Sequence, residues 1–279
     1  MKIAVTGASG FIGKCILSEL KKIEIEIIAV TRNANNLKEF PWIDHVIEMD
    51  ISNPHPEDLK TLHYPDILIH LAWDGLPNYK SLHHYEIELP KQYNFLKNLI
   101  QTGLPSVVVT GTCFEYGMQC GELMEHFTVN PTNPYGYAKD ALRRQLEFLQ
   151  REKHFLLTWT RLFYTFGEGQ HQTSLFMQLK AAINRGDEIF NMSRGEQIRD
   201  YLPVNEIARL LVMLALRKEN NGIVNICSGQ PISVRSLVEG WLQENQWNIS
   251  LNFGHYPYPD YEPFTFWGSR TKLDEILKN

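Results

Sequence analysis

Tyr135 and Lys139 are the two residues of this 279-residue sequence whose types and spacing point most directly to acid–base chemistry. They stand four positions apart in a segment opened by Asn133 and Pro134, a helix-capping residue followed by proline in the first turn. Residues at this spacing lie on one face of a helix. An ammonium beside a phenol favours the phenolate and lowers the phenol's pKa from its ordinary value near 10. The pair therefore predicts a tyrosine tuned for proton transfer.

A hydroxyl group is the third partner that such a site needs, and the strand predicted at residues 106–111 runs toward two candidates. Thr110 and Thr112 both stand near its end, and the residue pattern alone leaves the choice between them open. His70 ends an earlier predicted strand, where a histidine packed within the sheet is favoured over an acid–base role.

A glycine-rich turn at the start of the chain predicts a dinucleotide site. It follows a predicted strand at residues 2–6 and opens a predicted helix at 11–22. Glycines in such a turn let the backbone approach a pyrophosphate, while the N-terminus of the helix faces the phosphate charge. The spacing GxxGxxG is one residue longer than the common GxGxxG. Cofactor contacts are expected from Gly7, Gly10, Phe11, Ile12 and Gly13.

The end of the second predicted strand, at residues 25–31, bears on the choice between NADP and NAD. A carboxylate there accepts hydrogen bonds from the ribose 2′-hydroxyl, whereas a basic residue suits a 2′-phosphate. This chain has Arg32 followed by Asn33, and no acid. NADP(H) is therefore the favoured cofactor, with Asn33 as a helper of Arg32, and NAD(H) stays open.

Other cofactor contacts are expected at the ends of the next strands. Asp50 and Ile51 are placed to bond the adenine amino group and to cover its ring, although Asp50 could instead cap the segment that follows. Leu71 and Ala72 end the fourth predicted strand, where they would line the pyrophosphate and ribose. Tyr135 and Lys139 are expected to contact the cofactor too, with Lys139 on the nicotinamide ribose.

The elements that must position these residues alternate short apolar runs with helical patterns, which predicts an α/β fold with a doubly wound parallel sheet. The first 161 residues would hold six strands, at 2–6, 25–31, 46–49, 67–71, 106–111 and 155–161, and helices at 11–22, 78–102 and 134–152. Beyond them we expect helices at 173–185, 204–216 and 234–244, a strand at 223–227, and an aromatic-rich loop at 255–267.

The looser pattern after residue 161 predicts two parts. The dinucleotide-binding domain would span 1–161 with a return near 200–227, and residues 162–279 would form a smaller, interleaved lobe. The 27 basic and 32 acidic residues leave a charge of −5, which argues against nucleic-acid or anionic-membrane partners. Four cysteines without CxxC spacing argue against disulfides and a metal site. No run of about 18 apolar residues occurs, so a cytoplasmic globular protein is expected.

Taken together, the motifs TGASGFIG, HLAW, the strand ending before EYG, YGYAK and RDYLPV resemble the extended short-chain dehydrogenase/reductase family, of the NAD(P)-dependent epimerase/dehydratase type acting on nucleotide sugars. The resemblance implies a Rossmann-type domain with a smaller C-terminal substrate-binding lobe. It also implies a catalytic triad, which falls here on Thr112, Tyr135 and Lys139. Family members commonly dimerise through the helices expected here at 78–102 and 134–152, so a homodimer is expected.

Departures from the family pattern narrow the reaction. Cys113 and Phe114 stand where the resembling 4,6-dehydratases carry an acid pair, and Cys113 is one position away from the cysteine of the 3,5-epimerases, which makes it a weak candidate base. We therefore favour NADPH-dependent reduction of a dTDP- or CDP-linked 4-keto-6-deoxyhexose, in deoxysugar synthesis for surface polysaccharide such as O-antigen. The alternatives are a nucleotide-sugar 4-epimerase with tightly bound NAD and a non-catalytic NADP-binding sensor or scaffold.

The resemblance and the expected cleft also suggest residues that bind the sugar nucleotide. Arg199 matches an arginine that reaches the nucleotide in relatives, unless it pairs with the neighbouring Asp200 instead. Tyr164 replaces the asparagine that usually meets the substrate. Trp73 would form a wall of the sugar site or serve as a packing aromatic. The substrate-binding candidates are Trp73, Tyr164, Ser174, Gln178 and Arg199.

Overall fold

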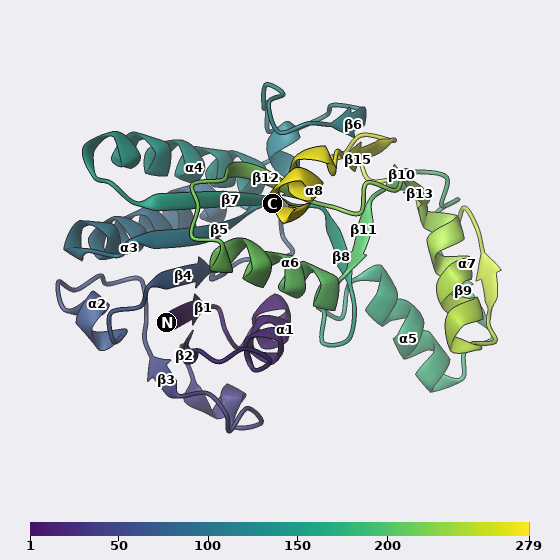
Figure 1. Ribbon diagram of the computed structural model, residues 1–279. Helices are drawn as coiled ribbons and strands as arrows, with labels where there is room; N and C mark the ends of the chain where they lie inside the picture. Colours follow the sequence, from purple (N-terminus) through teal and green to yellow (C-terminus); the bar gives the residue numbers. More distant parts are fainter. Residues whose placement is uncertain (279) are drawn as a thin grey trace.

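A seven-stranded, fully parallel sheet forms the centre of the molecule in the computed structural model, which describes residues 1–278 (Figure 1). Its strand order is β12-β7-β5-β4-β1-β2-β3. The strands are β1 (Lys2–Thr6), β2 (Glu26–Thr31), β3 (His45–Glu48), β4 (Ile67–His70), β5 (Ser106–Thr112), β7 (Leu156–Leu162) and β12 (Gly222–Ile226). This order confirms the predicted doubly wound, Rossmann-type α/β fold.

Helices cover both faces of the sheet, which is why its central strands are apolar on both sides. Every residue of β4 and β5 is buried. One face packs against α1 (Phe11–Leu20) and α6 (Val204–Leu216), and the other packs against α3 (Leu89–Thr102) and α4 (Pro134–Glu152). The shorter α2 (Asp58–Thr61) and α8 (Thr271–Lys278) contribute Leu59 and Leu273 to these two cores.

The chain returns to this sheet after leaving it. Strand β12 pairs with β7 at the sheet edge, with Ile223 opposite Trp159, and α6 packs on α1. Residues 204–226 therefore complete the first body of the protein, although they follow segments of the second.

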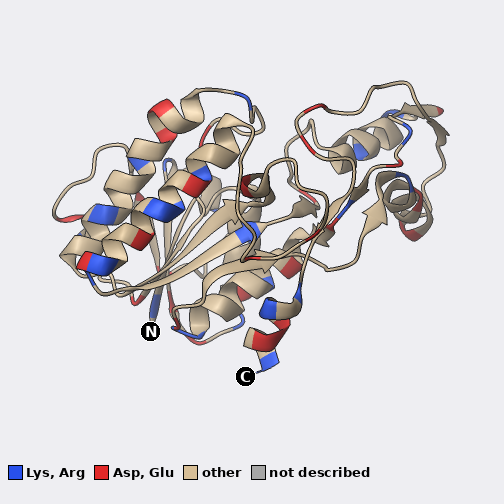
Figure 2. Cartoon of the chain, turned by 90° about the horizontal axis from the view of Figure 1, so that it is seen from above, with Lys and Arg blue, Asp and Glu red and all other residues tan. Residues whose placement is uncertain are grey.

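The remaining segments build a smaller lobe around Phe176, Leu179, Phe190, Val238 and Trp241. Its main elements are α5 (Leu175–Arg185), α7 (Val234–Asn245), β9 (Ile189–Asn191) and β14 (Ser250–Asn252). Short strands join the two bodies: β6 (Gly121–Leu123), β8 (Tyr164–Phe166), β10 (Ile198–Arg199), β11 (Tyr201–Pro203), β13 (Ile232–Ser233) and β15 (Phe266–Gly268). Figure 2 shows the lobe beside the sheet, with acidic and basic residues interspersed along the helices.

Two predicted elements differ in detail. The helix expected over 78–102 begins later, because Asn78 still belongs to a turn in which its N–H donates to the Gly75 carbonyl oxygen. A π-helical turn at His84–Glu88 leads into α3, where Pro90 stands in the first turn and has no N–H to continue a regular ladder. The tail expected as a loop over 255–267 ends in β15, whose Phe266 pairs with Gly121 of β6. Within residues 1–278, no helix has the length and apolar character needed to cross a membrane.

Candidate active site

The turn between β1 and α1 has a geometry that only glycine satisfies at two positions. Gly7 has a φ of +69°, and a Cβ there would lie 2.9 Å from the backbone nitrogen of Ala72. A Cβ on Gly13 would lie 2.3 Å from the carbonyl oxygen of Gly7. Gly10 starts α1 without a side-chain cap, which leaves the first N–H groups of the helix for an external acceptor. The turn therefore fits the pyrophosphate of a dinucleotide.

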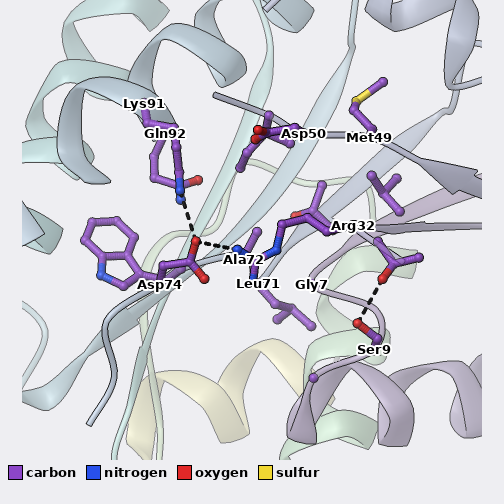
Figure 3. Close-up of a pocket in the computed structure, with 16 residues that line it drawn as sticks. Gly7, Ser9, Arg32, Met49, Asp50, Leu71, Ala72, Asp74, Lys91 and Gln92 are labelled. Carbon is purple, nitrogen blue, oxygen red and sulfur yellow. Dashed lines mark hydrogen bonds and ion pairs between the residues drawn. The ribbon is translucent and has the colours of Figure 1, made fainter. Parts of the chain in front are cut away.

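A pocket of about 220 Å³ adjoins this turn at the carboxyl ends of β1 to β4. Figure 3 shows Asp74 between Arg32 and Lys91, and the Arg32 Nη1 and Lys91 Nζ atoms lie 3.0 and 3.3 Å from its carboxylate. The Arg32 side chain is 72% exposed, so a larger anion can reach it. The predicted cofactor residues that line this pocket are Gly7, Gly10, Arg32, Asp50, Ile51, Leu71 and Ala72.

Two of the predicted residues at this end have local roles in the structure. Asp50 accepts a hydrogen bond from the backbone N–H of Ser52 at 2.9 Å, which lowers the pKa of its carboxyl. It caps no helix, because α2 begins only at Asp58. Asn33 caps the short 3₁₀ helix Ala34–Leu37 by accepting from the N–H of Asn35, and it does not line the pocket.

A second and larger cleft, of about 630 Å³, continues from the first and lies between the sheet and the smaller lobe. The two spaces share Gly7, Gly10, Leu71 and Trp73, so one groove runs from the tip of β2 past the glycine turn. The predicted residues that line this cleft are Phe11, Ile12, Gly13, Trp73, Tyr135, Lys139, Tyr164 and Ser174.

Helix α4 presents Tyr135 and Lys139 to this cleft from its first two turns. Asn133 caps the helix by accepting from the N–H of Gly136 at 2.8 Å. Lys139 Nζ donates to the carbonyl oxygen of Thr110 at 2.8 Å and lies 3.9 Å from the ring centre of Trp73. Trp73 packs edge-on against Tyr135, so its indole both stacks on the ammonium and borders the phenol.

Burial changes the electrostatics that the spacing predicts. We expect Lys139 to lower the pKa of Tyr135, but burial of the phenol raises its pKa above 10, and a hydrogen bond with the Thr112 side chain opposes this only in part. Burial also lowers the pKa of Lys139 from 10.5 to about 7. The physical reason is that both groups are shielded from water, which disfavours the charged form of each. At neutral pH Tyr135 therefore holds its proton.

Thr112 lies at the end of β5, where a buried carboxylate organises the turn. Its hydroxyl accepts from the N–H of Phe114 at 3.3 Å, while its own N–H donates to Glu115 at 2.9 Å. Glu115 also accepts from Arg161 Nε at 2.7 Å. Thr110 lines the cleft and Thr112 does not, although Thr112 is the one that contacts Tyr135. Sequence reasoning missed Glu115, because its partners come from distant strands.

The predicted substrate residues separate into two groups. Tyr164 and Ser174 line the cleft, and the Ser174 hydroxyl also caps α5. Gln178 and Arg199 do not line it, and Gln178 donates to the carbonyl oxygen of Thr173 at 2.5 Å. Arg199 is buried and donates through Nε to Glu262 at 3.0 Å.

The alternative partner considered for Arg199 is wrong. Asp200 instead accepts hydrogen bonds from Ser228 and from the N–H of Gly229, so it closes a backbone turn. Glu262, which takes its place beside Arg199, comes from the aromatic-rich tail. The sequence indicates an aromatic-rich loop there from its composition, but no residue spacing in the sequence identifies Glu262 as the partner of Arg199.

His70 and Cys113 are both buried away from the cleft. The His70 ring nitrogens bond the Thr6 hydroxyl and the Gln92 side chain, each at 2.8 Å, and burial lowers the pKa of the imidazole to about 3. Burial raises the pKa of the Cys113 thiol. Neither group titrates near neutral pH, which leaves Tyr135 and Lys139 as the candidate acid–base pair of this groove.

The fold and the groove define a class of protein. The sheet is of the Rossmann type with a glycine turn, and the groove leads from this turn to a buried tyrosine–lysine pair. This combination is typical of a dinucleotide-dependent enzyme. Residues 3–227 match the model of the NAD dependent epimerase/dehydratase family, and the chain belongs to this family, within the extended short-chain dehydrogenases/reductases.

Relatives and solved structures agree with this assignment. The chain is 28% identical to "dTDP-6-deoxy-L-talose 4-dehydrogenase (NAD(+))" of Aggregatibacter actinomycetemcomitans, over 97% of this chain and all of the relative. It is 23% identical to "dTDP-4-dehydro-6-deoxyglucose reductase" of Escherichia coli, over 85% of this chain and 79% of the relative. The structure of "MoeE5 in complex with UDP-glucose and NAD" superposes with a TM-score of 0.83 at 25% identity, covering all of this chain and 92% of the other.

Proposed function

We propose that this chain uses NADPH to reduce the C4 carbonyl of a nucleotide-linked 4-keto-6-deoxyhexose. The observation that carries the proposal is the position of the Tyr135 phenol, in the cleft that continues from the glycine turn. The names of two relatives describe oxidation or reduction at C4 of dTDP-linked 6-deoxyhexoses, which supports a reaction of the same kind here.

The residues of the chain supply a proton and orient the substrate. When bound, the reduced nicotinamide supplies the hydride that C4 accepts. Tyr135 donates its phenolic proton to the oxygen on C4, and its raised pKa keeps this proton in place until then. Protonated Lys139, 5.8 Å from the ring centre of Tyr135, favours the phenolate that remains. Thr112, whose side chain acts to lower the pKa of the phenol, would orient Tyr135.

The turn after β5 argues against elimination of water. An elimination needs a carboxyl group or a similar acid beside the reacting carbon, and this turn places the phenyl ring of Phe114 in the cleft. The thiol of Cys113 is buried, and its raised pKa disfavours a role as base. Simple hydride transfer with proton donation by Tyr135 therefore fits the groups that are present.

Arg32 supports NADPH as the reductant. Arg32 stands just beyond β2 and lines the smaller pocket beside the glycine turn, and its side chain is largely exposed. The end of β2 carries no carboxylate. A guanidinium there suits a 2′-phosphate. NADH is the natural competitor, because the structure of MoeE5 contains NAD and the talose relative is named for NAD(+).

A dTDP-linked sugar is the first choice of substrate and a CDP-linked sugar the second. CDP-abequose synthases of Salmonella typhimurium and Yersinia pseudotuberculosis are also among the relatives, at 26% and 22% identity. The product would enter deoxysugar synthesis for surface polysaccharide. We place the enzyme in the cytoplasm, where its reduced cofactor is regenerated.

The test of this proposal is to offer dTDP-, CDP-, GDP- and UDP-linked 4-keto-6-deoxyhexoses with NADPH and with NADH, and to follow absorbance of the reduced nicotinamide. Tyr135→Phe should lower kcat about a hundredfold or more, because it removes the general acid, while cofactor binding is retained. Tyr64→Phe is the control, since Tyr64 is exposed and lines neither the pocket nor the cleft. A Tyr135→Phe enzyme that keeps the wild-type rate would contradict the assignment of the acid.

A nucleotide-sugar 4-epimerase is the second candidate. A UDP-glucose 4-epimerase of Halalkalibacterium halodurans is 24% identical over 86% of this chain and 79% of the relative. An epimerase must retain its cofactor between two opposite hydride transfers. NAD that survives purification, together with turnover without added reductant, would favour epimerisation. Exchangeable NADPH that is consumed in step with the substrate would favour reduction.

We also propose that the protein forms a homodimer through the outer faces of the π-helical turn His84–Glu88 and of α4. Ile87, Tyr137 and Phe148 are each more than half exposed, although they are large apolar side chains. A second copy would cover this surface, consistent with the dimer contacts that the family resemblance implies. Sedimentation velocity of the full chain separates a monomer from a dimer.

A further inference from the structure

Glu262 is a buried carboxylate in the wall of the larger cleft. Its side chain is only 8% exposed, and it comes from the tail that crosses the cleft before β15. Oε2 accepts hydrogen bonds from Arg199 Nε at 3.0 Å and from the Tyr164 hydroxyl. Arg199 balances the negative charge of Glu262 from the side away from the cleft, since Glu262 lines the cleft and Arg199 does not.

The other oxygen of this carboxylate has no donor in the structure. Among residues 1–278, Glu262 Oε1 receives no hydrogen bond, whereas Oε2 receives two. Oε1 is not among the fully buried polar atoms of residues 1–278, so it stays accessible, and a ligand hydroxyl that replaces water there can donate to it. The cleft is the side on which such a donor can approach.

Aromatic rings line the cleft together with this carboxylate and with the proton donor. These rings belong to Tyr79, Phe114, Tyr164 and Tyr261. The ring centre of Phe114 lies 4.8 Å from that of Tyr79, 6.5 Å from that of Tyr164 and 6.2 Å from that of Tyr261. Tyr79 also lies 5.6 Å from Tyr135, ring centre to ring centre. The nearby carboxylate of Glu262 contributes to the raised pKa of Tyr79, which reaches about 12 mainly through burial.

This combination suits a ligand with apolar faces and hydroxyl groups at its edge. Apolar walls with few polar groups bury a ligand, and the polar groups fix its orientation. A six-membered sugar ring meets both demands. Tyr79 lies 5.6 Å from Tyr135, ring centre to ring centre, and Tyr79, Tyr135 and Glu262 line the same cleft. A hexose bound in this cleft can therefore face both the phenol and the carboxylate.

We propose that Glu262 determines substrate specificity by accepting, through Oε1, a hydrogen bond from the C2 or C3 hydroxyl of the hexose. The inference rests on the proposed function, because a 4-keto-6-deoxyhexose linked through C1 retains ring hydroxyls only at C2 and C3. Glu262 would hold the hexose with C4 toward Tyr135, and Arg199 and Tyr164 would hold Glu262.

The first test compares binding of dTDP alone with binding of a dTDP-linked 6-deoxyhexose by calorimetry, with the CDP pair used if the wild type does not bind dTDP. Glu262→Gln should weaken the sugar nucleotide about tenfold or more and leave the free nucleotide unchanged, since only the sugar meets the carboxylate. Glu196→Gln is the matched control. Glu196 also accepts from a tyrosine, Tyr258 at 2.9 Å, but it is exposed and outside the cleft.

The second test uses the wild-type enzyme and so does not depend on folding of a variant. Sugar nucleotides that lack the C2 or the C3 hydroxyl are compared with the parent compound. One of the two should bind about tenfold more weakly to the wild type, and this difference should largely disappear in Glu262→Gln.

Three results would overturn the inference. Equal weakening of dTDP and of its sugar conjugate would place Glu262 at the nucleotide. Unchanged sugar binding in Glu262→Gln, or no loss for either deoxy compound, would leave Glu262 only as the ion-pair partner of Arg199. A wild type that binds free nucleotides but no nucleotide-linked hexose would refute the proposed function, and this inference with it.

Discussion

Replacing Lys139 by methionine should change how the stability of the protein depends on pH. In the folded chain burial lowers the pKa of this ammonium from 10.5 to about 7. Between these two values the unfolded chain holds a proton that the folded chain has released. Folding stability therefore rises with pH across this interval, and the cost of burying the charge is fully present below pH 7.

The size of the effect follows from the two pKa values. A difference from 10.5 to about 7 corresponds to about 5 kcal/mol of penalty at low pH, at about 1.4 kcal/mol for each unit. Between pH 7 and pH 8.5, the gain in stability from Lys139 is about 2 kcal/mol. Buried thiols act in the opposite direction at higher pH, since burial raises the pKa of Cys113 and Cys227. The wild type and Lys139→Met both retain these thiols, so the contribution of the thiols cancels in the comparison.

The assay is urea unfolding of the wild type and of Lys139→Met at pH 7.0 and pH 8.5. The free energy of unfolding of the wild type should gain about 2 kcal/mol more than that of the variant over this interval. Lys38→Met removes an exposed positive charge and serves as the control, which should follow the wild type. If Lys139→Met follows the wild type as well, Lys139 keeps its proton in the folded state and the reasoning from burial is refuted.

Two further substitutions test the cofactor groove. Gly13→Ala should lower cofactor affinity at least tenfold and reduce the melting temperature, because its Cβ would lie 2.3 Å from the Gly7 carbonyl oxygen, whereas Gly240→Ala, with open space around its Cβ, should stabilise α7 slightly. Unimpaired cofactor titration of Gly13→Ala would show that the turn can adjust. Arg32→Ala should lower kcat/KM for NADPH about tenfold or more and leave that for NADH nearly unchanged, since only the 2′-phosphate meets the guanidinium. Equal loss with both cofactors would assign Arg32 to its ion pair with Asp74.

Local patterns were sufficient to predict most of the fold and the cofactor turn. Strands β1, β2, β4, β5 and β7 are short apolar runs, and the helices α1, α3 and α4 follow a period that neighbouring residues define. Gly13 meets the Gly7 carbonyl oxygen within the same turn, and the one-turn spacing of Tyr135 and Lys139 is a property of a single helix. Such features can be predicted from the sequence because the interacting residues are close along the chain.

The tertiary structure decided what surrounds these groups. Glu262 meets Arg199 and Tyr164 across 63 and 98 positions of sequence, and Glu115 meets Arg161 across 46. Burial reversed the expected direction of the Tyr135 pKa shift, because desolvation depends on every element packed around the phenol. Residue type and spacing identify the groups that can move a proton. The charge that each group carries, and the partner that it meets, depend on segments brought together only when the chain folds.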